Sequence, residues 1–210
     1  MKNGFRLDRE SGLLLLLLLG LKLSLLVLDH DVRFFLGDSQ TFVVNAVMGT
    51  ASNHRSFFYS FLIRWLGSLD MLLLMQTVGG AFAAFLLGIC LRIGLGVRAF
   101  VAWAAAIAFA VAPLQLAFER FVMSEALSML CFASFVTCQV LYLRRRTPFW
   151  LVISQVFGIC AIAFRVTFLP VIVLMTAGIL VWAVLDSGTS DSGFPEGSAS
   201  VVASCRLPEM

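Results

Sequence analysis

The chain has 210 residues, of which 60% are hydrophobic and 13% are charged, and its 15 basic and 12 acidic residues give a net charge of +3. An ordinary globular domain is about 45–50% apolar and about 25% charged. The composition therefore excludes a soluble globular domain, a disulfide-rich secreted module and, because the basic residues are scattered, a nucleic-acid-binding protein. We expect an all-α polytopic membrane protein.

Six apolar segments are candidates for membrane spans, because a helix needs about 20 apolar residues to cross the hydrocarbon. In chain order they cover about residues 12–28, 71–91, 99–114, 121–143, 149–164 and 168–185. Basic residues precede the first segment, as in a secretory signal, but no small-residue cleavage pattern follows it, which favours an uncleaved anchor. Lys22 interrupts this segment and is expected to extend toward the membrane surface.

The basic residues predict the orientation of the chain, because cytoplasmic connections carry more of them than external ones. One side receives Lys2, Arg6, Arg9, Arg92, Arg98, Arg144, Arg145 and Arg146, and the other receives Arg33, Arg55, Arg64, Arg120 and Arg165. We therefore expect both termini in the cytoplasm and residues 29–70 outside, with the plasma (inner) membrane as the location. Residues 1–185 form the membrane module, and the polar residues 186–210 are expected to be a disordered tail.

The outside loop, residues 29–70, is the longest connection and mixes polar with aromatic residues. Residues 39–48 and 57–66 carry apolar side chains at helical spacing, which predicts two helices. Their aromatic content is typical of helices that lie in the membrane interface. Asp38 or Ser39 can cap the first helix, since short polar side chains accept hydrogen bonds from its first N–H groups.

Short motifs follow one another from this loop onward. Residues 37–42 read GDSQTF, residues 55–60 read RSFFYS, residues 123–125 read MSE, and Gln76 and Phe164–Arg165 complete the series. Their order resembles the N-terminal half of lipid-carrier-dependent glycosyltransferases with the GT-C fold, above all the protein O-mannosyltransferase and aminoarabinose transferase group (glycosyltransferase family 39-like).

The chain departs from the pattern of this family in its residues and in its length. Phe42 stands where the family usually has tyrosine, and Ser56 and Phe57 stand where it often has prolines. The resemblance covers about residues 13–185, whereas such enzymes usually have more spans and a larger C-terminal region. Two interpretations therefore stay open: an intact transferase of this type, or a truncated or frameshifted form of one.

The resemblance implies transfer of a sugar from a polyprenyl-phosphate donor to a glycan, lipid or protein acceptor on the periplasmic or lumenal side. It assigns the role of general base to Asp38. Arg55 and Arg165 are candidates for neutralising the leaving phosphate, and Tyr59 and Glu125 complete the expected binding site. No soluble cofactor is expected, because the hydrophobic carrier lies in the membrane.

Each candidate also has a structural interpretation. Asp38 can act as a helix cap alone, and Arg55 and Arg64 can extend to phospholipid headgroups. Glu125 can form a local ion pair with Arg120, and Arg165 can be a plain boundary residue between two spans.

The D-x-D pattern at residues 29–31 makes Asp29 and Asp31 weaker candidates for holding a divalent cation. Charged residues are also expected there because a span ends at this point.

Two other functions compete with the transferase. A small transporter or channel subunit would use Glu125, Arg120 and Gln76 as polar groups within the membrane. A non-catalytic scaffold derived from a transferase would use the two interfacial helices to bind a partner.

Overall fold

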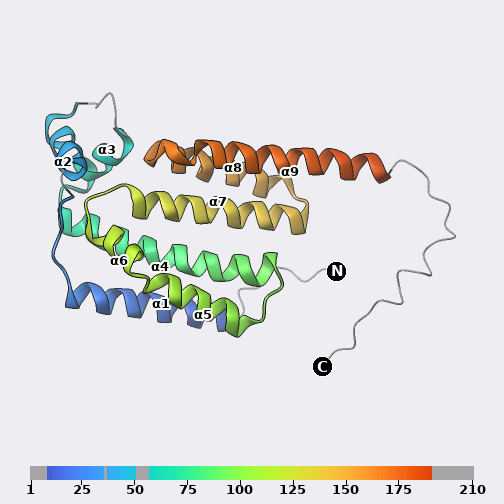
Figure 1. The fold of residues 1–210 in the computed structure, drawn as a ribbon, viewed down its shortest axis with the longest axis horizontal. Helices are drawn as coiled ribbons and strands as arrows, with labels where there is room; N and C mark the ends of the chain where they lie inside the picture. Colours follow the sequence, from blue (N-terminus) through green and yellow to red (C-terminus); the bar gives the residue numbers. More distant parts are fainter. Residues whose placement is uncertain (1–8, 36, 51–56, 191–210) are drawn as a thin grey trace. The chain divides into compact units, whose positions relative to one another are not determined.

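The structure is a computed structural model that describes residues 9–35, 37–50 and 57–190, and it divides the chain into two compact units, residues 1–169 and 170–210. All regular elements of the described residues are helical, as the sequence predicts (Figure 1). They are α1 (Arg9–Leu28), α2 (Asp38–Met48), α3 (Phe57–Leu66), α4 (Leu69–Gly94), α5 (Ala99–Ala110), α6 (Pro113–Arg120), α7 (Glu125–Arg145), α8 (Pro148–Phe164), the 3₁₀ helix η1 (Val166–Phe168) and α9 (Leu169–Ser190).

Four helical segments of the described chain are long and apolar enough to cross a membrane: Arg9–Leu28, Leu69–Gly94, Glu125–Arg145 and Val166–Leu185. The pair α5 and α6 makes a fifth candidate if both helices belong to one broken span. The remaining expected span, over residues 149–164, corresponds to α8, an apolar helix of 17 residues. The chain therefore has the character of an integral membrane protein, while the count of six spans stays a prediction.

Two of the expected spans have different boundaries in the structure. The helix expected over residues 99–114 ends at Ala110, and α6 leaves it at an angle of 47°. Pro113 explains the break, because proline cannot donate a backbone hydrogen bond and fits the first turn of a helix. The next helix begins at Glu125 rather than near residue 121, since Phe121 is extended.

The last helix is longer than the sequence predicts. α9 runs to Ser190, past the expected start of the tail at residue 186.

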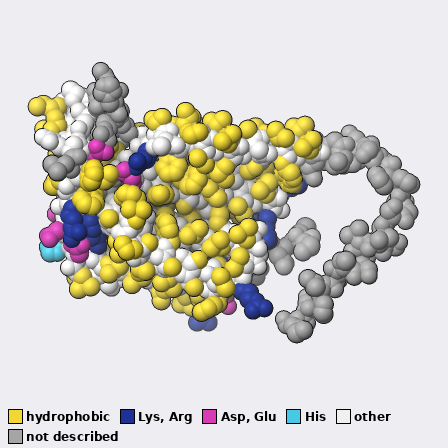
Figure 2. Space-filling model, in the orientation of Figure 1, with side chains coloured by type: hydrophobic (Ala, Val, Ile, Leu, Met, Phe, Trp, Pro, Cys, Tyr) yellow, Lys and Arg dark blue, Asp and Glu magenta, His cyan; other side chains and the backbone are white. Residues whose placement is uncertain are grey.

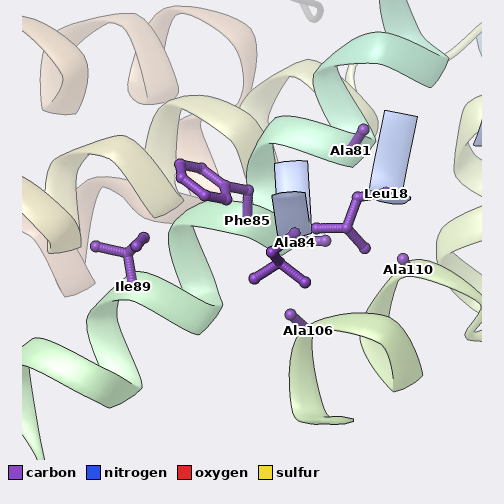
Figure 3. Close-up of a cluster of buried hydrophobic side chains, with 8 residues drawn as sticks. Leu18, Ala81, Ala84, Phe85, Ile89, Ala106 and Ala110 are labelled. Carbon is purple, nitrogen blue, oxygen red and sulfur yellow. The ribbon is translucent and has the colours of Figure 1, made fainter. Parts of the chain in front are cut away.

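Small residues let the helices of the first unit approach closely. Ala102, Ala106 and Ala110 form a fully buried stripe on α5, and a Cβ at Gly88 of α4 would lie only 3.2 Å from Ala106 Cβ. Figure 3 shows the buried cluster that includes Ala106 and Ala110 of α5, Leu18 of α1, and Ala81, Ala84, Phe85 and Ile89 of α4. Close packing of small residues drives helix association in lipid, where no hydrophobic effect acts between helices.

The helices α2 and α3 lie at one end of the first unit, where α1, α6 and α8 end and α4 and α7 begin (Figure 1). We call this the loop end. Both helices match the two predicted over residues 39–48 and 57–66, with α2 starting one residue earlier. Figure 2 shows the charged side chains of this unit gathered toward the ends of its helices, with a band of hydrophobic side chains between them. This distribution suits a bundle that crosses a membrane.

Candidate functional site

A short backbone pairing joins the segment that follows α1 to the segment between α6 and α7. The N–H of Arg33 donates to the carbonyl of Arg120 at 2.9 Å, and the N–H of Val122 donates to the carbonyl of Arg33 at 3.1 Å. The hydroxyl of Ser39 adds a second link, since it accepts from the N–H of Phe35 at 2.8 Å and donates to the carbonyl of Val122 at 2.9 Å. These bonds fix the start of α2 beside the segment that leads into α7.

The first turn of α2 differs from the prediction that Asp38 or Ser39 caps it. The N-cap residue is Gly37, whose φ of 92° suits glycine. Ser39 is fully buried and its hydroxyl is used by Phe35 and Val122 instead. Asp38 is therefore the first helical residue, where its negative charge faces the positive end of the helix dipole. Its side chain is partly exposed.

A buried hydrogen bond joins Tyr59 of α3 to Gln76 of α4. The side-chain amide of Gln76 donates to the hydroxyl of Tyr59 at 3.0 Å and lies 2.9 Å from the carbonyl of Met123. Tyr59 is fully buried, with the ring of Phe42 packed edge-on at 4.8 Å between centroids. Burial, and then the negative charge of Glu125, raise the pKa of the Tyr59 phenol above its ordinary value. The phenol therefore stays protonated, and it orders the site rather than acting as a base.

Glu125 and Arg165 form an ion pair at the loop end. Nη1 of Arg165 donates to Oε1 of Glu125, and its Nε donates to the Thr167 hydroxyl at 3.1 Å. The Glu125 side chain is 11% exposed, whereas that of Arg165 is 43% exposed. The ring of Phe58 packs edge-on against Phe164 at 5.3 Å and so holds α3 on this end of α8. The pair is a half-open cationic site with a nearly buried carboxylate behind it, so Arg165 is more than a boundary residue.

The local ion pair expected between Arg120 and Glu125 does not form. Arg120 is buried and instead donates to the hydroxyl of Thr77 at 3.2 Å, while its Nε lies 3.8 Å from the carboxylate of Asp29. Asp29 also accepts from Arg33 at 3.1 and 3.2 Å. The extended backbone at Phe121 separates the two expected partners.

The carboxylate of Asp29 is thus used in ion pairs with Arg33 and Arg120, while the cation-binding interpretation of residues 29–31 stays a prediction. Among the described residues, no group of three His, Cys, Asp or Glu side chains is arranged to hold a metal ion.

A second ion pair lies deeper in the bundle. Nζ of Lys22 donates to Oε1 of Glu119 at 2.6 Å, with both side chains almost completely buried. The amide of Gln115 donates to the same oxygen at 2.9 Å. The pair needs the glycine at position 80, because a Cβ there would lie 1.9 Å from Oε1 of Glu119. The expectation that Lys22 extends to the membrane surface is therefore wrong.

An apolar cavity of about 260 Å³ lies among α4, α5 and α7. Its lining includes Leu86, Leu87 and Cys90 of α4, Phe109 of α5, and Phe132 and Val136 of α7. The cavity has the chemistry to hold a hydrocarbon chain and no polar group to hold a headgroup.

The structure thus gathers Tyr59, Glu125 and Arg165 at the loop end, and Asp38 stands at the start of the helix that is attached there through Ser39. Arg55 lies outside the described residues. Sequence reasoning missed the Lys22–Glu119 pair, although a lysine inside an apolar segment was a signal that it needs an acidic partner. Comparison with protein-family models, curated proteins and solved structures found no match.

Proposed function

We propose that the chain is a membrane glycosyltransferase of the GT-C type, which transfers a sugar from a polyprenyl-phosphate donor to an acceptor outside the cytoplasm. The observation that carries the proposal is the Glu125–Arg165 pair, which presents a fixed, half-exposed guanidinium at the loop end. The motif resemblance and the attachment of α2 at the same end support it. The apolar cavity among α4, α5 and α7 suits the hydrocarbon part of the carrier.

In the proposed reaction, the acceptor hydroxyl oxygen attacks C1 of the sugar while the bond between C1 and the phosphate oxygen breaks. The hydroxyl proton passes to the carboxylate of Asp38, which acts as general base. Polyprenyl phosphate leaves as an anion and is held by Arg165 through charge-assisted hydrogen bonds. Glu125 and Thr167 bind two other edges of the guanidinium, so that its orientation is set before the donor arrives.

The proposal includes six spans, formed by α1, α4, the α5–α6 pair, α7, α8 and α9, with both termini in the cytoplasm. We expect an impermeant thiol reagent to label Thr50→Cys in intact cells and to label Thr147→Cys only after the membrane is opened. Both positions are exposed, at the loop end and the opposite end of the unit, and Cys205 is replaced by serine to remove background. Labelling in the reverse pattern would overturn this orientation.

The test of function uses the purified full chain in nanodiscs, first with radiolabelled polyprenyl-phosphate hexoses and pentoses and then with polyprenyl phosphate alone. We expect release of the sugar by transfer to water, which stands in for the acceptor hydroxyl in this assay. We expect Arg165→Gln to weaken polyprenyl-phosphate binding at least about tenfold, because a hydrogen bond to a charged group contributes about 1.5–3 kcal/mol. Arg33→Gln is the matched control, since Arg33 is an exposed arginine at the same end. Equal binding by the Arg165 variant and the wild type would contradict the phosphate role.

A small transporter is the second candidate, and the Lys22–Glu119 pair is the observation that favours it. Charged groups within membrane spans often mark ion or substrate pathways, and broken helices are common beside transporter sites. Here Glu119 of the buried pair belongs to α6, the second helix of the broken pair. Flux of an ion or solute into proteoliposomes, without any sugar transfer, would support this function over the first.

A further inference from the structure

A small cavity of about 130 Å³ lies between α2 and α3, apart from the Glu125–Arg165 pair. Its lining residues are Asn45, Ala46 and Gly49 of α2 and Ser60, Phe61 and Arg64 of α3. A water molecule in the liquid takes up about 30 Å³, so a cavity of this size has room for a phosphate group.

The cation of this cavity is Arg64, which is exposed. Its guanidinium lies over Gly49, since a Cβ at that position would be only 2.2 Å from Nη1 of Arg64. Within the described residues, no carboxylate forms an ion pair with Arg64. The negative end of the α2 dipole attracts the guanidinium toward Gly49, but it leaves most of the N–H groups available to a ligand.

The hydroxyl of Ser60 is the second and independent observation. Ser60 is 2% exposed and lines the cavity, and within the described part of the chain its Oγ has no hydrogen-bond partner. A buried hydroxyl without a partner is unfavourable, because it has lost its hydrogen bonds to water, so such groups in proteins usually bind a ligand or a water molecule. The dipole of α2 explains the position of Arg64 but does not satisfy this hydroxyl.

An apolar cavity of about 390 Å³ adjoins the polar one and shares Ala46 and Arg64 with it. The other residues that line it include Val43 and Val47 of α2, Ile63 of α3, and Leu69 at the start of α4. A free anion would leave this apolar surface uncovered. A phospholipid would fill both cavities, because it carries a phosphate and an acyl chain.

We propose that α2 and α3 bind one anionic phospholipid, with its phosphate on Arg64 and Ser60 and an acyl chain along Val43, Val47 and Ile63. The Asn45 side-chain amide lines the same cavity and supplies a further donor. This site is distinct from Arg165, where the sugar donor is proposed to bind, and it does not depend on transfer activity. The bound lipid would hold the two helices at the membrane surface.

The test measures thermal unfolding of the purified full chain in detergent during titration with phosphatidylglycerol, phosphatidylcholine or inorganic phosphate. We expect phosphatidylglycerol to raise the unfolding temperature, because a ligand that binds only the folded state stabilises it. Phosphatidylcholine and inorganic phosphate should have little effect. Arg64→Gln should weaken the apparent affinity for phosphatidylglycerol at least about tenfold, and Arg64→Lys should weaken it less.

The variant Ser60→Ala tests whether a loss of lipid affinity can be distinguished from a loss of folding stability. Without lipid, this variant should be at least as stable as the wild type, because it removes an unpaired buried hydroxyl. With phosphatidylglycerol it should bind about threefold to tenfold more weakly. Arg33→Gln, at an exposed arginine outside the cavity, should bind as the wild type does.

Three outcomes would overturn the proposal. Equal stabilisation by inorganic phosphate would show an anion site that needs no lipid. Unchanged affinity in both Arg64→Gln and Ser60→Ala would place the lipid elsewhere. If phosphatidylglycerol did not stabilise the wild type, the chain would have no such lipid site.

Discussion

Replacing Asp38 by asparagine is expected to lower sugar transfer by about 10²–10⁴-fold, the usual contribution of a general base. The structure makes this substitution a clean test. Since Gly37 is the N-cap of α2, Asp38 is not needed as the cap, and asparagine keeps the size of the side chain while it removes the negative charge near the helix N-terminus. That charge contributes about 0.3–1 kcal/mol at an exposed site. The measurement compares turnover of a radiolabelled polyprenyl-phosphate sugar with the unfolding temperature of the same preparation.

Two control variants test whether the effect of Asp38→Asn is specific to this carboxylate. Asp31→Asn removes an exposed acid near the same end and should leave turnover almost unchanged. Ser39→Ala breaks the bonds to Phe35 and Val122, so it should lower stability by about 1–3 kcal/mol through the unpaired groups it leaves. Full turnover in Asp38→Asn together with loss in Asp31→Asn would move the general base to the earlier acid.

The sequence predicts the helices of this chain well because the pattern that specifies them is local. Apolar segments predict the long apolar helices, and the spacing of Phe42, Val43 and Ala46 predicts α2 almost to the residue. The break between α5 and α6 is signalled by Pro113, but the direction of α6 after it depends on what α6 packs against. The start of α7 moves to Glu125 because the segment before it pairs with Arg33, a residue 88 positions from Phe121 by numbering (121 − 33).

Sequence reasoning did not predict which charged residues form ion pairs, because ion-pair partners are close in the folded structure and need not be close in the sequence. Glu125 lies close to Arg120 in sequence, yet its partner is Arg165, 40 residues away. The partner of Lys22 is 97 residues away. The low polarity of the bundle decides both cases, since a charge that cannot reach water must find an opposite charge within the fold.

The largest expected effect on stability follows from this second pair. Lys22→Met should lower the free energy of unfolding by about 3–5 kcal/mol, because it leaves the buried carboxylate of Glu119 without its counter-ion. Within the described residues, Oε2 of Glu119 has no hydrogen-bond partner, so Gln115 would be the one hydrogen-bond donor left to the carboxylate among these residues. The measurement is unfolding of the detergent-solubilised chain by increasing SDS.

The double variant Lys22→Met/Glu119→Met decides whether the charges themselves are needed. An apolar pair of similar volume often replaces a buried ion pair without loss, so the double variant should recover most of the stability lost by Lys22→Met. Glu10→Gln is the matched control, because Glu10 forms an exposed ion pair with Arg92 at 3.8 Å and such pairs contribute about 0–1 kcal/mol. If Lys22→Met were as stable as the wild type, the carboxylate of Glu119 would have to be hydrated or protonated inside the bundle. A double variant that folds but loses transfer or flux would instead show that the pair has a role in function, because its stability would already have been restored.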